Sequence, residues 1–127
     1  KFDVVLNIES SHCYGNIDQF MSEVTRVLKP GGHFLWCDLR PGNSREKTNT
    51  HFANSGLQLI NKNEITDNIV VALEKMSADR KNTIKSRVPR LVRNVFESYA
   101  GVEGSRVHDS FINGSLIYLS AIMQKSE

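Results

Sequence analysis

The first forty residues contain two apolar runs separated by an amphipathic stretch. Phe2–Ile8 is a run of apolar and β-branched residues without alternation, which is typical of a strand buried on both faces of a parallel sheet. Apolar residues then recur at helical spacing from Ile17 to Leu28, and His33–Leu39 is a second apolar run. A helix between two buried strands predicts a βαβ unit, whose right-handed connection brings the carboxyl ends of both strands to one edge.

Local signals support these boundaries. Asn16 is expected to cap the helix, and Asp18 in its first turn complements the helix dipole. Lys29 is expected in the last turn, Pro30 should stop the helix, and Gly31-Gly32 should form the turn into the second strand.

The rest of the chain predicts three helices and two strands. The expected order is a short helix around Arg45–Ala53 ended by Gly56, a strand at Leu57–Ile60, a helix from Glu64 capped by Asn63, a helix at about Asp79–Tyr99 that Pro89 kinks or divides, an irregular stretch Ala100–Asn113, and a buried strand Ser115–Gln124.

Composition excludes several classes of protein. The net charge of +2 over 127 residues is too small and too scattered to favour binding to nucleic acid or to an anionic membrane. No long uncharged apolar run or signal peptide is present, so we expect a cytoplasmic protein without a transmembrane segment. The helix expected at about Asp79–Tyr99 carries a group of basic residues, which we interpret as a solvated face. A surface for an anionic substrate or a partner is the alternative. These residues are Arg80, Lys81, Lys85, Arg87, Arg90 and Arg93.

The cysteines and histidines show no metal pattern. Cys13 and Cys37 are expected to be reduced thiols, and a disulfide between them is the alternative. The spacing of His33, His51 and His108 relative to these cysteines does not match a zinc site, so no metal is predicted.

Polar residues follow both strands of the predicted βαβ unit. Glu9–Tyr14 comes after the first strand, and Asp38–Arg40 ends the second. Ligands of open α/β sheets bind beyond the carboxyl ends of the strands, so the topology predicts a site at this edge.

The same residues resemble a known family. The stretch Phe2-Asp3-Val4-Val5-Leu6, a polar loop with an acid and a histidine, and a helix ending Val27-Leu28-Lys29-Pro30-Gly31-Gly32 before an apolar strand are similar to the second half of class I S-adenosylmethionine-dependent methyltransferases. The loop Ile8–Tyr14 and the stretch Asp38-Leu39-Arg40-Pro41 most resemble small-molecule and lipid O-methyltransferases, with the mycobacterial phthiotriolone/phenolphthiotriolone methyltransferases as the nearest group.

The resemblance implies a fold and a domain organisation. The family sheet has the strand order 3-2-1-4-5-7-6, and this chain would supply the Rossmann-like α/β block 4-5-7-6 with flanking helices. Residues 1–127 would then be the C-terminal portion of a methyltransferase domain, with a helical, cap-like insertion at about residues 63–112. The family's glycine-rich turn is not found, so S-adenosylmethionine would be bound mainly by an N-terminal half, and the fragment alone is expected to be inactive.

The resemblance also implies roles for the edge residues. His12 is the candidate general base, and Glu9 would hold the acceptor or orient His12. Asn7 and Ile8, through their backbone, and Glu9 would lie at the cofactor. Tyr14, Asp38 and Arg40 are the candidate substrate-binding residues, although Asp38 and Arg40 could instead pair with each other, and each of these residues could have only a structural role.

The implied reaction is methylation of oxygen on a small or lipid-like acceptor, and carbon methylation is also compatible with such a loop. Two alternatives remain at this point: a non-catalytic α/β interaction or regulatory module, and another doubly wound enzyme such as a dehydrogenase. Without a neighbouring strand on its far side, Phe2–Ile8 would expose an apolar edge, which predicts self-association through this strand.

Overall fold

The computed structural model describes residues 1–87, 89–92 and 104–127, and it divides the chain into two compact units. The first unit contains Lys1–Glu64 and Ile117–Glu127, and the second contains Ile65–Leu116. The first unit holds the predicted site and is described first.

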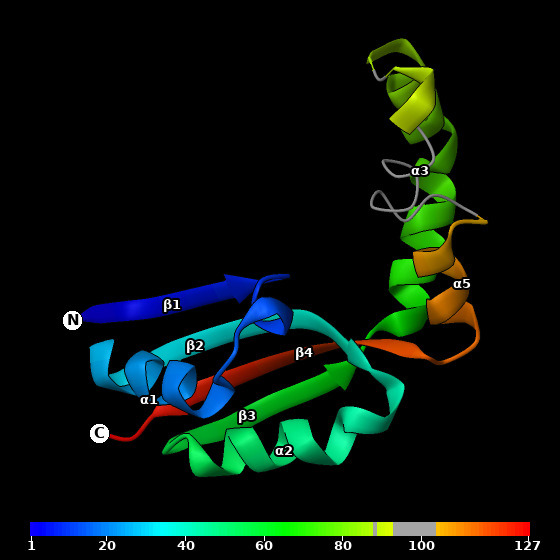
Figure 1. Cartoon of the computed structure of the whole chain (residues 1–127). Helices are drawn as coiled ribbons and strands as arrows, with labels where there is room; N and C mark the ends of the chain where they lie inside the picture. Colours follow the sequence, from blue (N-terminus) through cyan, green and yellow to red (C-terminus); the bar gives the residue numbers. More distant parts are fainter. Residues whose placement is uncertain (88, 93–103) are drawn as a thin grey trace. The chain divides into compact units, whose positions relative to one another are not determined.

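A four-stranded mixed sheet forms the centre of the first unit (Figure 1). Its strands are β1 (Phe2–Ile8), β2 (Leu28–Pro41), β3 (Leu57–Glu64) and β4 (Leu116–Lys125), in the spatial order β1-β2-β4-β3. β1 pairs in parallel with β2, and β3 pairs antiparallel with β4. The predicted βαβ unit and the predicted block 4-5-7-6 are therefore both confirmed.

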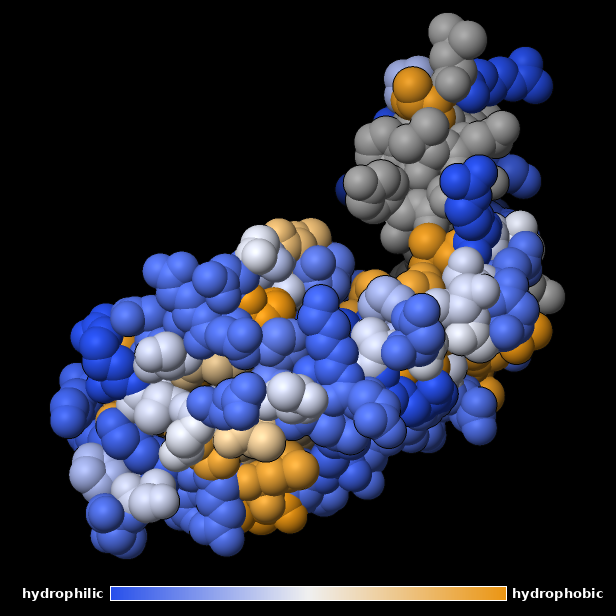
Figure 2. All heavy atoms as spheres, turned by 60° about the horizontal axis from the view of Figure 1, so that its bottom comes forward, coloured by the Kyte–Doolittle hydropathy of each residue, from blue (hydrophilic) through white to orange (hydrophobic). Residues whose placement is uncertain are grey.

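One face of the sheet packs against α1 (Ile17–Val27) and α2 (Arg45–Asn54). The buried side chains between them form one core, whose largest fully buried members are Phe34, Met21 and Leu28. The predicted cap of α1 is present, because the backbone N–H of Gln19 donates to Oδ1 of Asn16 at 3.0 Å. The face of this unit that Figure 2 presents is mainly hydrophilic, as expected for the outer sides of the two helices.

Strand β1 was expected to be buried on both faces, and this is wrong for the described residues. Phe2, Leu6 and Ile8 are 59%, 62% and 64% exposed, whereas Asn7 on the other face is buried. The reason is that β1 is the outermost strand of this sheet and that α1 and α2 cover only one face.

The boundary between α1 and β2 also differs from the prediction. α1 ends at Val27, Leu28 is already extended, and Lys29 lies in β2 instead of in the last helical turn. Lys29 precedes a proline, and a residue in that position disfavours the helical conformation. Its side chain instead donates to both carboxylate oxygens of Asp3, at 2.8 and 2.9 Å.

Strand β3 is longer than its hydrophobic pattern predicted. Asn61-Lys62-Asn63 was expected to turn the chain, with Asn63 as a helix cap, but β3 continues to Glu64 and pairs there with Leu119. β3 is the second outer strand of the sheet, and its polar residues can pair through the backbone while their side chains reach solvent.

The described part of the second unit is helical: α3 (Thr66–Arg87), the 3-10 helix η3 (Arg90–Val92) and α5 (Arg106–Ile112). α3 runs without a break through the point where two helices were expected, and it ends two residues before Pro89. The helix predicted at Asp79–Tyr99 extends beyond the described residues, and Arg93 is not among them. Lys85, Arg87 and Arg90 are exposed, as a solvated basic face requires.

The stretch Ala100–Asn113 was expected to be irregular, but its described part contains α5. Ser105 caps this helix by accepting from the backbone N–H of His108 at 3.3 Å, and Phe111 is buried. The helix has only 7 residues, and three of them are apolar, which is too short a stretch for a helical period to be recognised.

Candidate active site

The loop after β1 and the end of β2 meet at the carboxyl edge of the sheet. Ser11–Cys13 form the 3-10 helix η1, and Asp38 lies near the end of β2. This turn places the side chains of Ser11 and His12 beside Asp38, so the structure brings together residues that are more than 25 positions apart.

Asp38 is completely buried and accepts hydrogen bonds from several groups. Its Oδ1 accepts from Nδ1 of His12 at 2.7 Å and from the backbone N–H of Leu39 at 2.8 Å. Its Oδ2 accepts from the Ser11 hydroxyl at 2.7 Å and from the backbone N–H of His12 at 2.9 Å, and it lies 3.1 Å from Nη1 of Arg40. The predicted contact between Asp38 and Arg40 is therefore present.

These contacts determine the protonation of the pair. Burial opposes ionisation of Asp38, but hydrogen bonds from Ser11 and His12, together with the charge of Arg40, hold the pKa of the carboxyl below its ordinary value. An ionised carboxylate can only accept hydrogen bonds, so Nδ1 of His12 carries the proton in this contact. In the ring tautomer that fits this contact, Nε2 carries the lone pair, and no group in the described part of the chain hydrogen-bonds to it.

A second layer fixes the carboxylate itself. The Ser11 hydroxyl donates to Asp38 and accepts from Nε1 of Trp36 at 2.8 Å and from Nη2 of Arg40 at 2.7 Å. The guanidinium carbon of Arg40 also lies 5.0 Å from the centre of the Trp36 ring. Arg40 thus contacts Asp38, Ser11 and the ring of Trp36.

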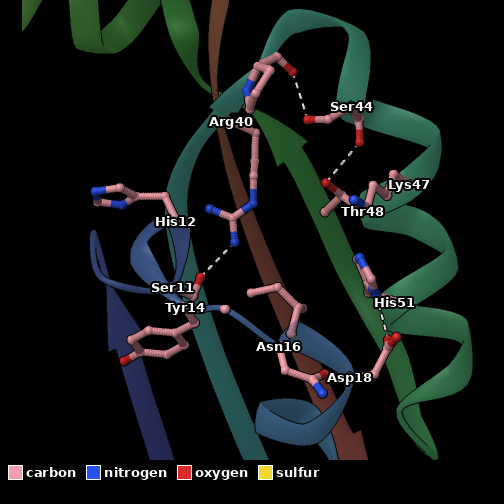
Figure 3. A pocket seen from close by; sticks show the side chains of 13 residues that line it. Ser11, His12, Tyr14, Asn16, Asp18, Arg40, Ser44, Lys47, Thr48 and His51 are labelled. Atoms are coloured by element: carbon pink, nitrogen blue, oxygen red, sulfur yellow. Dashed lines mark hydrogen bonds and ion pairs between the residues drawn. The ribbon is translucent and has the colours of Figure 1, made fainter.

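A cleft of about 490 Å³ opens beside this network (Figure 3). Arg40 and Pro41 line one wall. The other is lined by Ser44, which directly precedes α2, and by Lys47, Thr48 and His51 of α2. In Figure 3 the imidazole of His12 lies on the opposite side of Arg40 from α2 and points away from that helix. His12 is 30% exposed, so it lies at the rim of the cleft.

A second histidine–aspartate pair lines the same cleft. Nδ1 of His51 lies 2.5 Å from Oδ1 of Asp18, and a dashed line marks this contact in Figure 3. Here the carboxylate side chain is 61% exposed, whereas that of Asp38 is fully buried. The sequence pattern did not single out this pair, and it provides a matched control for experiments on His12 and Asp38.

Tyr14 and Asn7 form a smaller polar group at the same edge. The Tyr14 hydroxyl accepts from Nδ2 of Asn7 at 3.1 Å and lies 2.8 Å from the Ser10 hydroxyl, and its ring packs edge-on against Phe20. Oδ1 of Asn7 is buried and has no partner among the described residues. Ile8, in contrast, has an exposed side chain, and its role would have to come from the backbone, as expected.

Among the described residues, Glu9 forms no hydrogen bond or ion pair with His12, and the residue that contacts the imidazole is Asp38. Glu9 has a backbone φ of +49°, a conformation that costs a non-glycine residue energy. Its backbone N–H donates to the carbonyl of Cys37 at 2.8 Å, and its Oε2 accepts from the hydroxyl of Tyr118 at 3.2 Å.

Three residues of this edge were missed from the sequence: Ser11, Trp36 and Tyr118. Trp36 and Tyr118 lie on predicted buried strands, and each has one polar group that requires a partner when it is buried. That requirement was the available signal. Cys13 and Cys37, which were expected to be reduced, are both free thiols.

Neither a metal-binding cluster nor a membrane-spanning helix occurs among the described residues. They contain no group of three or more histidines, cysteines, aspartates or glutamates that could hold a metal ion. They also contain no helix that is both long and apolar enough to cross a membrane.

The fold is that of class I methyltransferases. Residues 1–36 match a family model described as a methyltransferase domain. Among solved structures, the O-methyltransferase of a trans-AT PKS multienzyme of Brevibacillus brevis, in complex with S-adenosyl-L-homocysteine, superimposes with a TM-score of 0.71. That alignment covers 98% of this chain and 44% of the other chain at 17% identity, so it shows the fold alone.

Two relatives are more similar in sequence. The chain is 37% identical over 118 residues to a phthiotriol/phenolphthiotriol dimycocerosates methyltransferase of Mycobacterium leprae, covering 93% of this chain and 44% of the relative. It is 39% identical over 100 residues to a fatty-acid O-methyltransferase of Mycolicibacterium smegmatis, covering 78% of this chain and 36% of the relative. The predicted resemblance is therefore confirmed, and the chain spans less than half the length of these relatives.

Proposed function

We propose that this chain is the C-terminal part of an S-adenosylmethionine-dependent methyltransferase that methylates oxygen on a small or lipid-like acceptor. One observation carries the proposal: His12 has its Nδ1 fixed by a buried, ionised Asp38 and its Nε2 available at the carboxyl edge of the sheet. The names of the two relatives, both methyltransferases of lipid-like molecules, support the substrate class.

The proposed chemistry requires a base. Methyl transfer to a hydroxyl would form an O–C bond as the S–C bond of the sulfonium breaks and S-adenosylhomocysteine leaves, and the hydroxyl must lose its proton. Nε2 of His12 would accept that proton, since it is the nitrogen not used in the contact with Asp38. The ring then becomes an imidazolium, which the Asp38 carboxylate stabilises at 2.7 Å. Ser11 and Arg40 keep Asp38 ionised and in place.

The residues of this edge fit a positively charged cofactor. When bound, S-adenosylmethionine supplies an electrophilic methyl on a sulfonium. The Glu9 carboxylate and Oδ1 of Asn7, which has no partner among the described residues, are both acceptors, and they suit the donors and the charge of its methionine part. We assign Asn7, Ile8 and Glu9 to this part, and Tyr14 to the wall of the acceptor site.

We further propose that the helical stretch at about residues 63–112 is a cap that contributes to acceptor binding. The division of the chain at Ile65–Leu116 supports a separate helical unit. Val71 and Met76 on α3 are 46% and 49% exposed, so apolar side chains remain available for a lipid-like acceptor. The cytoplasmic location expected from the sequence stays a prediction.

The proposal is tested by a methyl-transfer assay. The full-length protein is incubated with S-adenosylmethionine labelled in its methyl group and with a panel of long-chain alcohols, phenols and fatty acids, and the products are analysed by mass spectrometry. We expect label on an acceptor oxygen and one S-adenosylhomocysteine for each product formed. Binding of S-adenosylhomocysteine without transfer to any acceptor would instead favour the non-catalytic alternative.

The exposed face of β1 leads to a separate prediction for the 127-residue chain by itself. Its outer edge presents backbone groups without a strand partner in the described sheet, next to the exposed side chains of Phe2, Leu6 and Ile8. Such an edge pairs with another chain. We expect dimers or larger species in analytical ultracentrifugation.

The Leu6→Lys variant should raise the dissociation constant of this association at least about tenfold, because an edge lysine blocks strand pairing. Asn43→Lys, at an exposed position in the 3-10 helix Gly42–Ser44, adds the same charge and should have no effect. A wild-type chain that stays monomeric at high micromolar concentration would contradict association through β1.

A further inference from the structure

Tyr118 is the one polar-tipped aromatic residue on β4. Ile117, Leu119, Ala121 and Met123 belong to the core beneath α1 and α2. Because side chains alternate along a strand, Tyr118 lies on the other face of the sheet. It is only 5% exposed, and its hydroxyl donates to Oε2 of Glu9 at 3.2 Å.

Glu9, which accepts this hydrogen bond, has an unusual backbone conformation. A φ of +49° favours glycine, yet the residue at this position is a glutamate. The hydrogen bond from the backbone N–H of Glu9 to the carbonyl of Cys37 fixes the backbone at this position. The hydrogen bond from Tyr118 fixes the carboxylate, so the Glu9 side chain is held at both of its ends. Strained residues of this kind occur where the side chain has a function, and the strain therefore points to the carboxylate of Glu9.

The chemical state of the pair is well defined. Burial, followed by the neighbouring Cys37 and Glu9, raises the pKa of the Tyr118 phenol well above its ordinary value. The phenol therefore stays protonated and donates at any pH at which the enzyme would be assayed. Burial also raises the pKa of Cys37, so this thiol remains neutral beside them.

The two faces of β2 thus carry two separately oriented groups. On one face, Asp38 fixes His12. On the other face, beside Cys37, Tyr118 fixes Glu9. The second arrangement joins residues 109 positions apart in the sequence, and neither of its contacts involves His12 or Asp38.

We propose that Tyr118 is a positioning residue that holds one oxygen of the Glu9 carboxylate, so that the other oxygen is presented to the bound cofactor or acceptor. The inference rests on the proposed function, in which Glu9 contacts the cofactor. Tyr118 itself touches neither reactant, and its effect passes through Glu9.

A double-mutant cycle on the full-length protein tests this inference. The variants are Tyr118→Phe, Glu9→Gly and the combination of both, with Ser120→Ala on β4 as a control. Phenylalanine keeps the ring of Tyr118, and glycine suits the φ of position 9, so each change removes one polar group while the backbone is retained. The readouts are kcat, KM, the Kd of S-adenosylhomocysteine by calorimetry, and Tm.

We expect Tyr118→Phe to lower kcat/KM by roughly 10- to 150-fold, the loss that follows removal of a hydrogen bond to a charged group. The same change should have no further effect in the Glu9→Gly background, and Ser120→Ala should resemble the wild type. Glu9→Gly should lower kcat/KM without lowering Tm.

The outcomes separate the inference from the proposed function. If Glu9→Gly leaves both activity and the Kd unchanged, the proposed role of Glu9 is wrong. If Glu9→Gly impairs the enzyme but Tyr118→Phe does not, Tyr118 is not a positioning residue. An equal loss from Tyr118→Phe in both backgrounds would also overturn the inference, because a purely structural effect does not depend on Glu9.

Discussion

His12→Ala is expected to lower kcat for methyl transfer by about 10²- to 10⁴-fold, the usual contribution of a general base. The reason is that Nε2 of His12 is the proton acceptor in the proposed reaction, held in place through Nδ1 by Asp38. The measurement is the steady-state rate of the full-length protein with labelled S-adenosylmethionine. The Kd of S-adenosylhomocysteine should stay within about threefold of the wild type, because His12 removes a proton and does not hold the cofactor.

The matched control is His51→Ala. His51 also contacts an aspartate and lines the same cleft, but Asp18 is largely exposed and far less constrained than Asp38. Its loss should leave kcat within about threefold of the wild type. If His51→Ala abolishes activity and His12→Ala does not, the assignment of the base is wrong.

Asp38→Asn is expected to have the second largest effect, a loss of about 10²- to 10⁴-fold in kcat. The corresponding change in a serine protease triad has an effect at the upper end of this range. An asparagine amide can donate to Nδ1 of His12, which favours the ring tautomer that carries its proton on Nε2 and cannot accept another. The change also removes the charge that stabilises the imidazolium. Asp18→Asn is the control and should have little effect.

The same variant tests the electrostatics of the fold. Because the pKa of Asp38 is lower in the folded protein than its ordinary value, its ionised form stabilises the folded state above that ordinary value. The contribution is lost as the pH falls through the lowered folded pKa. Asp38→Asn should therefore lower the urea midpoint at neutral pH, with a smaller difference from wild type in acid. An identical difference at both pH values would show that the stabilisation does not come from ionised Asp38.

The sheet could be predicted because the hydrophobic pattern of its elements agrees with the capping residue between them. The apolar runs at β1 and β2, the helical period of α1 and the capping residue Asn16 all favour one βαβ unit. The edge at which His12 and Asp38 meet then follows from topology, because the carboxyl ends of parallel strands lie together.

The roles within that edge were less predictable. Whether Glu9 or Asp38 orients His12 depends on the 3-10 turn of η1, which directs the His12 ring toward β2. Composition and period contain no information on such a turn. The contact between Tyr118 and Glu9 depends on β4 returning beside β2, a pairing between opposite ends of the chain.

Two boundaries were wrong for related reasons. β3 extends through polar residues because backbone pairing with β4 continues to Glu64, and hydrophobic pattern alone does not show this pairing. α3 runs on to Arg87 because its interior contains no proline or glycine to stop it. At β3 the signal that favoured an earlier end was an asparagine, and at α3 it was a break in the apolar stripe. Each is weaker than a long run of backbone hydrogen bonds.

The most direct test of the account is a single-turnover experiment in which wild type and His12→Ala, both loaded with methyl-labelled S-adenosylmethionine, are mixed with the same hydroxyl acceptor. The account predicts that label appears on the acceptor oxygen in the wild type, and that the variant, with the cofactor equally bound, transfers it at least about a hundredfold more slowly. Equal rates in the two proteins would contradict it, because proton removal would then not depend on the pair formed by His12 and Asp38.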